Sequence, residues 1–217
     1  MACSFGKLFE QLLKEIDVKN IGLFPGKFKP PHRGHFETCK QAAAENDMVA
    51  VLISSKLHEG ISAEQSFNIW NIYKKYVPNI IPFICTPTPV LACYDLANIL
   101  NHGEYQTSPA SAHGPRSNVE ELVSNCREIE SYINVGNSII LNLYSSPEDQ
   151  SRFKNIQKQP YVGNNILKIE YKPVNRLTSA SQFRQAIKSN KNVNSFLPAQ
   201  LSSQDKHTIN NLIHEAI

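Results

Sequence analysis

The run MVAVLIS at residues 48–54 is the feature that most limits the folds open to this chain. Seven residues that are nearly all apolar, with no alternation of polar and apolar positions, are typical of a strand buried on both faces. Strands of this kind occur in parallel sheets that helices cover on both sides. Similar apolar runs predict strands at residues 21–24, 80–86, 138–144 and 166–171, the last nearer an edge because polar residues alternate in it.

Helical patterns separate these runs. The segment at 62–65 (SAEQ) resembles a capping box at the start of a helix that Pro78 ends, and a helix at 38–46 would form the first crossover. We expect further helices at residues 90–100, 119–132, 147–153, 179–188 and 203–216. Strands that alternate with helices predict an α/β fold, a Rossmann-like doubly wound parallel sheet of about five strands.

Composition bounds the function. The 217 residues suffice for one sizeable domain, and a net charge of +3 is too mild to indicate nucleic-acid binding. Five scattered cysteines without a CxxC pair suggest neither a disulfide framework nor a zinc knuckle. With no signal-like segment and no apolar run long enough to span a membrane, we expect a cytoplasmic protein without a membrane partner.

The predicted domain organisation has two parts. Residues 4–17 carry apolar side chains at helical spacing, so residues 1–19 form an amphipathic helical extension ahead of the domain at 20–217. This helix is expected to pack on the domain's own core. The alternative is a contact with a partner or with a second copy of the chain, which would give a homo-oligomer. Residues 103–117, rich in Gly, Pro, Ser and Ala, are expected to form a mobile loop.

The residues best suited to binding or catalysis lie between the first predicted strand and the helix after it. The Pro25-Gly26 pair is expected to end the strand, and helical spacing begins at Phe36. Basic and imidazole side chains fill the segment between them: Lys27, Lys29, His32, Arg33 and His35. Backbone N–H groups and the positive end of a helix dipole make such a loop an anion site, so phosphate is the first ligand to consider.

His32 and His35 are three residues apart at the start of a helix, where both side chains can face one phosphate. Two imidazoles there can stabilise the charge that develops when a phosphoryl bond is exchanged. Gly34 would let a phosphate or a nucleobase approach the backbone. Two surface histidines remain the alternative from this pattern alone, and a zinc site is weaker because further ligands are missing.

The segment GKFKPPHRGH at residues 26–35 resembles the GxFxPxHxGH element of the nucleotidyltransferase superfamily. That superfamily includes nicotinamide mononucleotide adenylyltransferases, phosphopantetheine adenylyltransferases, FAD synthetases and cytidylyltransferases. The resemblance implies transfer of a nucleotidyl group, AMP rather than CMP, from a nucleoside triphosphate with Mg²⁺ to a phosphorylated acceptor such as nicotinamide mononucleotide. Pyrophosphate would be released.

A second segment agrees with the first. SASQFR at residues 179–184 resembles the superfamily's ISxTxxR element, whose hydroxyls and arginine bind the triphosphate. The resemblance implies catalytic roles for His32, His35 and Arg184. It implies nucleotide-binding roles for Phe24, Gly26, Lys27, Phe28, Lys29, Gly34, Ser179 and Ser181. Lys29 departs from the pattern, which usually has an uncharged or acidic residue there.

Several alternatives stay open. CTP is the second choice of nucleotide donor. The alternative to an enzyme is a nucleotide-binding or structural module that keeps the fold but does not turn over substrate. The acceptor is not identified by the sequence. Trp70, Tyr73 and Tyr76 could stack on an aromatic ring, but their helical spacing favours core packing. The chain lacks the lysine loop of class I aminoacyl-tRNA synthetases and the P-loop of nucleoside triphosphatases, which sets both of these classes aside.

Overall fold

The computed structural model describes residues 18–103, 117–134, 138–158, 161–174, 180–189 and 191–214. The helix expected at residues 4–17 lies outside the described residues. So does the loop expected at 103–117, apart from its first and last residue. The division into an N-terminal extension and a domain therefore stays a prediction.

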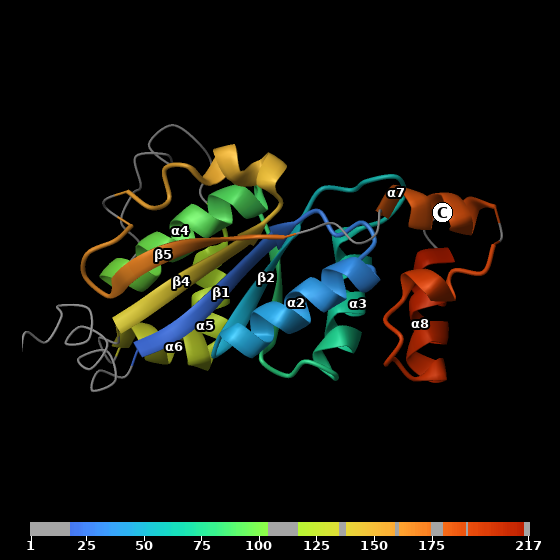
Figure 1. Cartoon of the computed structure of the whole chain (residues 1–217), viewed down its shortest axis with the longest axis horizontal. Coiled ribbons are helices and arrows are strands. Elements are labelled where there is room, and N and C mark those ends of the chain that lie inside the picture. The colour runs from blue at the N-terminus through green and yellow to red at the C-terminus, as the bar shows by residue number, and fades with distance from the viewer. Residues whose placement is uncertain are drawn as a thin grey trace, which may run out of the picture.

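A five-stranded parallel sheet forms the centre of the molecule (Figure 1). Its strands lie in the order β3-β2-β1-β4-β5, and each neighbouring pair is parallel. They are β1 Val18–Gly26, β2 Met48–Ser54, β3 Ile80–Cys85, β4 Ser138–Ser145 and β5 Ile166–Pro173. The α/β Rossmann-like fold predicted from the sequence is confirmed, and β5 lies at an edge as expected.

Helices cover both faces of this sheet. They are α2 Arg33–Glu45, α3 Ala63–Lys74, α4 Pro89–His102, α5 Val119–Asn125, α6 Arg127–Asn134, α7 Ala180–Lys188 and α8 Ser203–His214, with short 3-10 helices η1 Pro147–Phe153 and η2 Asn194–Phe196. One core joins the sheet to α4, α5, α6 and η1, and the other joins it to α2, α3, α7 and α8. All seven residues of β2 are buried, because alternate side chains enter the two cores.

The first strand ends at the Pro25-Gly26 pair as expected, although both residues belong to it and pair with Leu52 and Ile53 of β2. One prediction about a helix is wrong. The helix expected at 119–132 is broken into α5 and α6 at Cys126, whose backbone is extended. The break falls after Ser124 and Asn125, and Ser, Asn and Cys have only modest helix propensity.

The strand order places a switch point beside β1. The chain moves outward from β1 to β2 and β3, then returns to the other side of β1 as β4. In sheets of this kind ligands bind beyond the carboxyl ends of the strands at the point where the order reverses. Residues 27–32, the histidine loop, connect the carboxyl end of β1 to α2 and therefore lie at this point (Figure 1).

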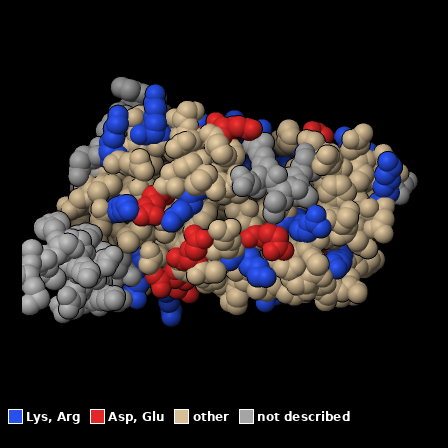
Figure 2. Space-filling model, in the orientation of Figure 1, with Lys and Arg blue, Asp and Glu red and all other residues tan. Residues whose placement is uncertain are grey.

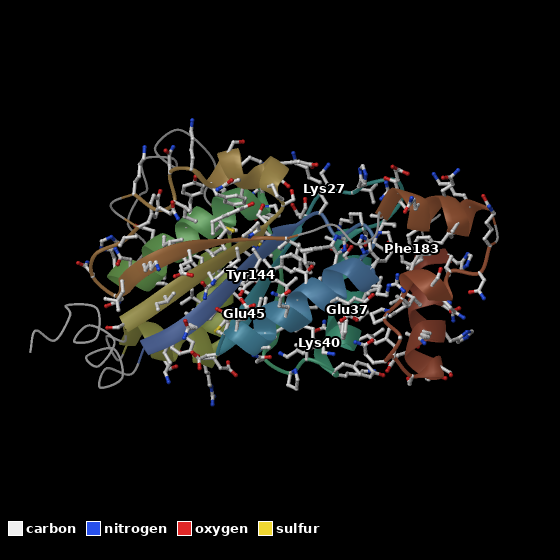
Figure 3. The ribbon with its side chains drawn as sticks, viewed as in Figure 1. Lys27, Glu37, Lys40, Glu45, Tyr144 and Phe183 are labelled. Atoms are coloured by element: carbon white, nitrogen blue, oxygen red, sulfur yellow. The ribbon has the colours of Figure 1, made fainter. Side chains whose placement is uncertain are left out.

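A buried polar network fixes the opposite end of α2 to the sheet. The Asn46 side-chain amide donates to the carbonyl of Ala42 (2.7 Å) and to the hydroxyl of Tyr144 (2.8 Å), while Asn142 donates to the Asn46 oxygen (2.8 Å). Tyr144 in turn donates to Glu45 (2.8 Å). Figure 3 shows Tyr144 and Glu45 toward this end of α2, and Lys27 just beyond the carboxyl end of β1.

Replacing Asn46 by Ala should lower the free energy of unfolding by about 2–3 kcal/mol, because it leaves the buried Asn142 amide without its acceptor and breaks three hydrogen bonds at once. Urea unfolding followed by circular dichroism measures this. Gln41→Ala removes a single exposed hydrogen bond to Glu45 on the same helix and serves as the control. Equal losses in the two variants would contradict a structural role for the network.

Candidate active site

His32 and His35 stack on each other at the start of α2. Their ring centroids are 3.7 Å apart and their planes differ by 21°. His32 is the residue just before the helix and is 3% exposed, whereas His35 is half-buried. The backbone N–H of His32 donates to Nδ1 of His35 (3.3 Å), so a neutral His35 ring carries its proton on Nε2.

Burial sets the charge of His32. The pKa of His32 falls from 6.5 to about 4 because burial disfavours the charged imidazole. His32 is therefore neutral at pH 7 and can act on a phosphate through a ring N–H rather than through a full positive charge.

A cluster of aromatic side chains packs against His35. The ring of Phe28 packs edge-on against His35 (centroids 5.0 Å apart) and Trp70 (5.2 Å), and at a tilt against Phe24 (5.1 Å). Phe24 and Phe28 are 5% and 3% exposed. These two residues of the proposed nucleotide-binding set thus lie in the core, where Phe28 packs against His35.

Gly26 is explained by the same cluster. A Cβ atom built on Gly26 would lie 2.6 Å from the ring of Phe28, closer than packed carbon atoms approach. The glycine therefore makes room for Phe28. The preference for core packing of Trp70 and Tyr73 is confirmed, because both side chains are fully buried.

Helix α3 holds the backbone of the histidine loop. Its Ser66 hydroxyl donates to the carbonyl of Phe28 (2.7 Å), and its Tyr73 hydroxyl donates to the carbonyl of Pro31 (3.3 Å). The remaining bond comes from α7, where Nη1 of Arg184 donates to the carbonyl of Lys29 (2.5 Å). Helices from two distant parts of the sequence therefore fix the loop that carries His32 and leads into α2, where His35 lies.

Lys29 points inward. Its side chain is buried, and Nζ donates to the carbonyl of Ser62 (2.8 Å), just before α3 begins. Burial lowers the pKa of Lys29 to about 8, with Glu64 acting in the opposite sense. Lys29 is thus a buried cation that fastens the loop to α3, whereas Lys27 and Arg33 are exposed to solvent.

Arg184 is also buried and is 5% exposed. Besides the Lys29 carbonyl, it donates through Nη2 to Glu59 Oε1 (2.8 Å) and to the hydroxyl of Ser181 (3.1 Å). The fold therefore brings Arg184, Ser181 and the histidine loop together across 155 residues of sequence. Ser179 lies outside the described residues, so its predicted role is a prediction only.

Sequence reasoning did not predict the contacts that three residues make in this site: Glu59, Ser66 and Tyr73. The side chains of Ser66 and Tyr73 bind loop carbonyls, a role that leaves no motif in the sequence. Glu59 follows β2, so its place beyond the carboxyl end of a strand was the only signal for it.

Charge is mixed on the molecular surface. Lys and Arg side chains alternate with Asp and Glu on the face seen in Figure 2, in keeping with the small net charge. Within the described residues no group of three or more His, Cys, Asp or Glu side chains could hold a metal ion. None of the helices described is long and apolar enough to cross a membrane.

The described fold is a parallel α/β sheet with a histidine pair at its switch point and Arg184 brought in from a late helix. No protein-family model matches the sequence, and no curated protein matches it. Among solved structures, a proposed nicotinate-nucleotide adenylyltransferase from Vibrio parahaemolyticus matches with a TM-score of 0.50 and 14% identity over 90% of this chain and 98% of that one.

Two other structures match with TM-scores of 0.48. A bifunctional NMN adenylyltransferase/ADP ribose pyrophosphatase from Francisella tularensis, solved with AMP and a manganese ion, is 13% identical over 91% of this chain. NadR protein in complex with NR is 19% identical over 79% of this chain. The chain spans 51% of the first of these proteins and 42% of the second. The likeness to the Vibrio parahaemolyticus structure, at 14% identity, shows a shared fold.

The buried His32 predicts a pH dependence of stability. Between about pH 6.5 and pH 4 the unfolded chain binds a proton at this residue and the folded chain does not, so stability falls as the pH falls through this window. Relative to His32→Gln, the natural protein should lose roughly 2–3 kcal/mol of unfolding free energy from pH 7 to pH 4. Urea unfolding at each pH measures this, with His207→Gln, which removes an exposed histidine, as the control. A difference between protein and His32→Gln that stays constant over this range would contradict the burial of a neutral imidazole.

Proposed function

We propose that this protein is a nucleotidyltransferase that transfers AMP from ATP to a phosphorylated acceptor such as nicotinamide mononucleotide and releases pyrophosphate. One observation carries the proposal. The stacked pair His32 and His35 lies at the switch point of the sheet, and the hydrogen bond from Arg184 to the Lys29 carbonyl joins the two motifs directly. This assembles donors for several phosphate groups at the edge of the sheet where ligands bind.

The reaction needs no covalent intermediate with the protein. A phosphate oxygen of the acceptor forms a bond with the α-phosphorus of ATP, the bond from that phosphorus to the bridging oxygen breaks, and the electron pair leaves with pyrophosphate. Because the acceptor is already a nucleophile, the protein contributes positioning and electrostatic stabilisation. We assign the reacting α-phosphate to His35, the more accessible ring of the pair, through its Nε2–H.

The remaining cations suit the other end of the triphosphate. Arg184 and Ser181 share a hydrogen bond on α7, and exposed Lys27 follows the end of β1. In the proposal these three groups hold the β- and γ-phosphates, while buried Lys29 acts by shaping the loop. Mg²⁺ enters with the triphosphate, bound mainly by phosphate oxygens and water, and neutralises part of its charge.

The choice of AMP rests on two supports. The loop GKFKPPHRGH is closer to the adenylyltransferase form of the motif than to the cytidylyltransferase form. The fold is shared with a proposed nicotinate-nucleotide adenylyltransferase along nearly the whole of that chain. The same comparison favours a mononucleotide acceptor, which makes nicotinamide mononucleotide and nicotinate mononucleotide the first acceptors to test.

Pyrophosphate release tests the proposal directly. The purified protein, with Mg²⁺ and either ATP or CTP, is offered a panel of acceptors: nicotinamide mononucleotide, nicotinate mononucleotide, phosphopantetheine, FMN and glycerol phosphate. We expect release with ATP and one mononucleotide acceptor. ATP binding without pyrophosphate release in the presence of any acceptor would favour the non-catalytic alternative. Pyrophosphate release with CTP alone would identify CTP as the donor in place of ATP.

His35→Ala should lower kcat by roughly 10²-fold or more, because it removes a donor aimed at the charge that develops on the phosphate. Steady-state kinetics on the acceptor identified above measures the change, and circular dichroism checks the fold. Exposed His207→Ala provides a matched control away from the loop. A folded His35→Ala protein with unchanged kcat would rule out this assignment.

A further inference from the structure

The carboxylate of Glu59 lies among three basic groups. Its Oε1 accepts from Nη2 of Arg184 at 2.8 Å and lies 3.6 Å from Nε2 of His58, while its Oε2 lies 3.6 Å from Nζ of Lys188. Arg184 and Lys188 come from successive turns of α7, and Glu59 comes from the loop after β2. The three basic groups form a binding site for an anion, and the Glu59 carboxylate occupies it.

The two sides of this contact differ in how firmly they are held. The Arg184 side chain is 6% exposed and is fixed by the Lys29 carbonyl and the Ser181 hydroxyl. The Glu59 side chain is 43% exposed and belongs to a turn that Gly60 continues. The carboxylate can therefore move into water at small cost, whereas the guanidinium stays where it is.

Within the part of the chain that the structure describes, the guanidinium of Arg184 also has an unused hydrogen-bond donor, Nε. Among the described residues its buried Nε has no hydrogen-bond partner, although Nη1 and Nη2 both have one. A buried N–H without an acceptor is costly, so a ligand that supplies an acceptor there binds with an advantage. A phosphate group offers more oxygens and more charge than a carboxylate and can engage several donors of one guanidinium.

We propose that Glu59 occupies a phosphate position in the free protein, and that the terminal phosphates of the nucleotide displace it from Arg184 and Lys188. This inference rests on the proposed function for the nature of the ligand, a nucleoside triphosphate. It adds two residues to the site. Glu59 competes with the substrate for Arg184, and Lys188, one turn beyond Arg184, becomes a phosphate ligand once the carboxylate has left.

Electrostatics supports the exchange. The pKa of Glu59 is held below its usual range, first by the hydrogen bond from Arg184 and then by the nearby charges of Arg184, Lys188 and His58. The same groups that keep this carboxylate ionised would attract a triphosphate more strongly, because it carries several negative charges. Glu59 thus keeps the buried Arg184 paired while no nucleotide is bound.

The test uses binding of inorganic tripolyphosphate and of ATP with Mg²⁺, measured by isothermal titration calorimetry on the full chain. Glu59→Gln keeps a hydrogen-bond acceptor near Arg184 but removes the charge, so both ligands should bind roughly fivefold tighter. Lys188→Gln should weaken both by a similar factor, since it removes a charge that is 54% exposed in the free protein. Matched controls are Glu64→Gln, in the next helix, and Lys191→Gln, three residues beyond Lys188.

Each result has a definite meaning. Tighter binding by Glu59→Gln, weaker binding by Lys188→Gln and little change in the controls support the exchange. Weaker binding by Glu59→Gln would overturn it, because Glu59 would then position Arg184 for the ligand. A gain in Glu64→Gln equal to that in Glu59→Gln would also overturn it, as a general effect of charge.

The inference and the proposed function can fail separately. If tripolyphosphate binding follows the expected pattern but no acceptor releases pyrophosphate, the anion site stands and the enzyme activity does not. If pyrophosphate is released but Glu59→Gln binds no tighter, the activity stands and the exchange does not. Absence of tripolyphosphate binding to both the natural protein and Glu59→Gln would overturn the exchange.

Discussion

The hydrogen bond from Arg184 to the carbonyl of Lys29 is the interaction on which the candidate site depends. It joins α7 to the loop between β1 and α2, two segments 155 residues apart. Ser66 and Tyr73 hold the neighbouring carbonyls from α3, so three donors leave the loop little freedom. Rigid placement of this kind matters in phosphoryl chemistry, where the protein contributes mainly geometry and charge.

Burial divides the basic groups of the site into two kinds. His32 is driven to its neutral form by desolvation, while Lys29 and Arg184 stay charged inside the protein because each has oxygen partners. Lys27, Arg33 and Lys188 meet solvent and can respond to a ligand. Among the buried groups Lys29 and Arg184 shape the loop, and in the proposal Arg184 also meets the triphosphate, while the exposed groups supply charge that a substrate can reach.

The general architecture follows from the sequence because burial leaves a clear pattern. The run at 48–54 predicted a strand buried on both faces, and alternate residues of β2 do enter the two cores. The spacing of His32 and His35 predicted two rings side by side, and they stack. The capping box at Ser62 and Gln65 is also present. These features depend on residues close together in the chain.

The details that failed or were missed depend on contacts between distant segments. Nothing near Lys29 in the sequence shows that its ammonium turns inward to Ser62, and nothing near Arg184 indicates Glu59, 125 residues earlier. A motif likewise does not say whether Phe28 faces a ligand or the core. The break at Cys126 was missed because only modest propensities mark it.

The contact between Gly26 and Phe28 has a consequence for how such motifs are compared between proteins. A glycine at the end of the first strand is readily taken as a phosphate contact, yet here its size is dictated by a ring two residues later. The two positions are sterically coupled, so a chain with a small side chain at the second position loses that reason for a glycine at the first. In an alignment of relatives they should vary as a pair, and a profile that scores each column independently would undervalue chains that have changed both.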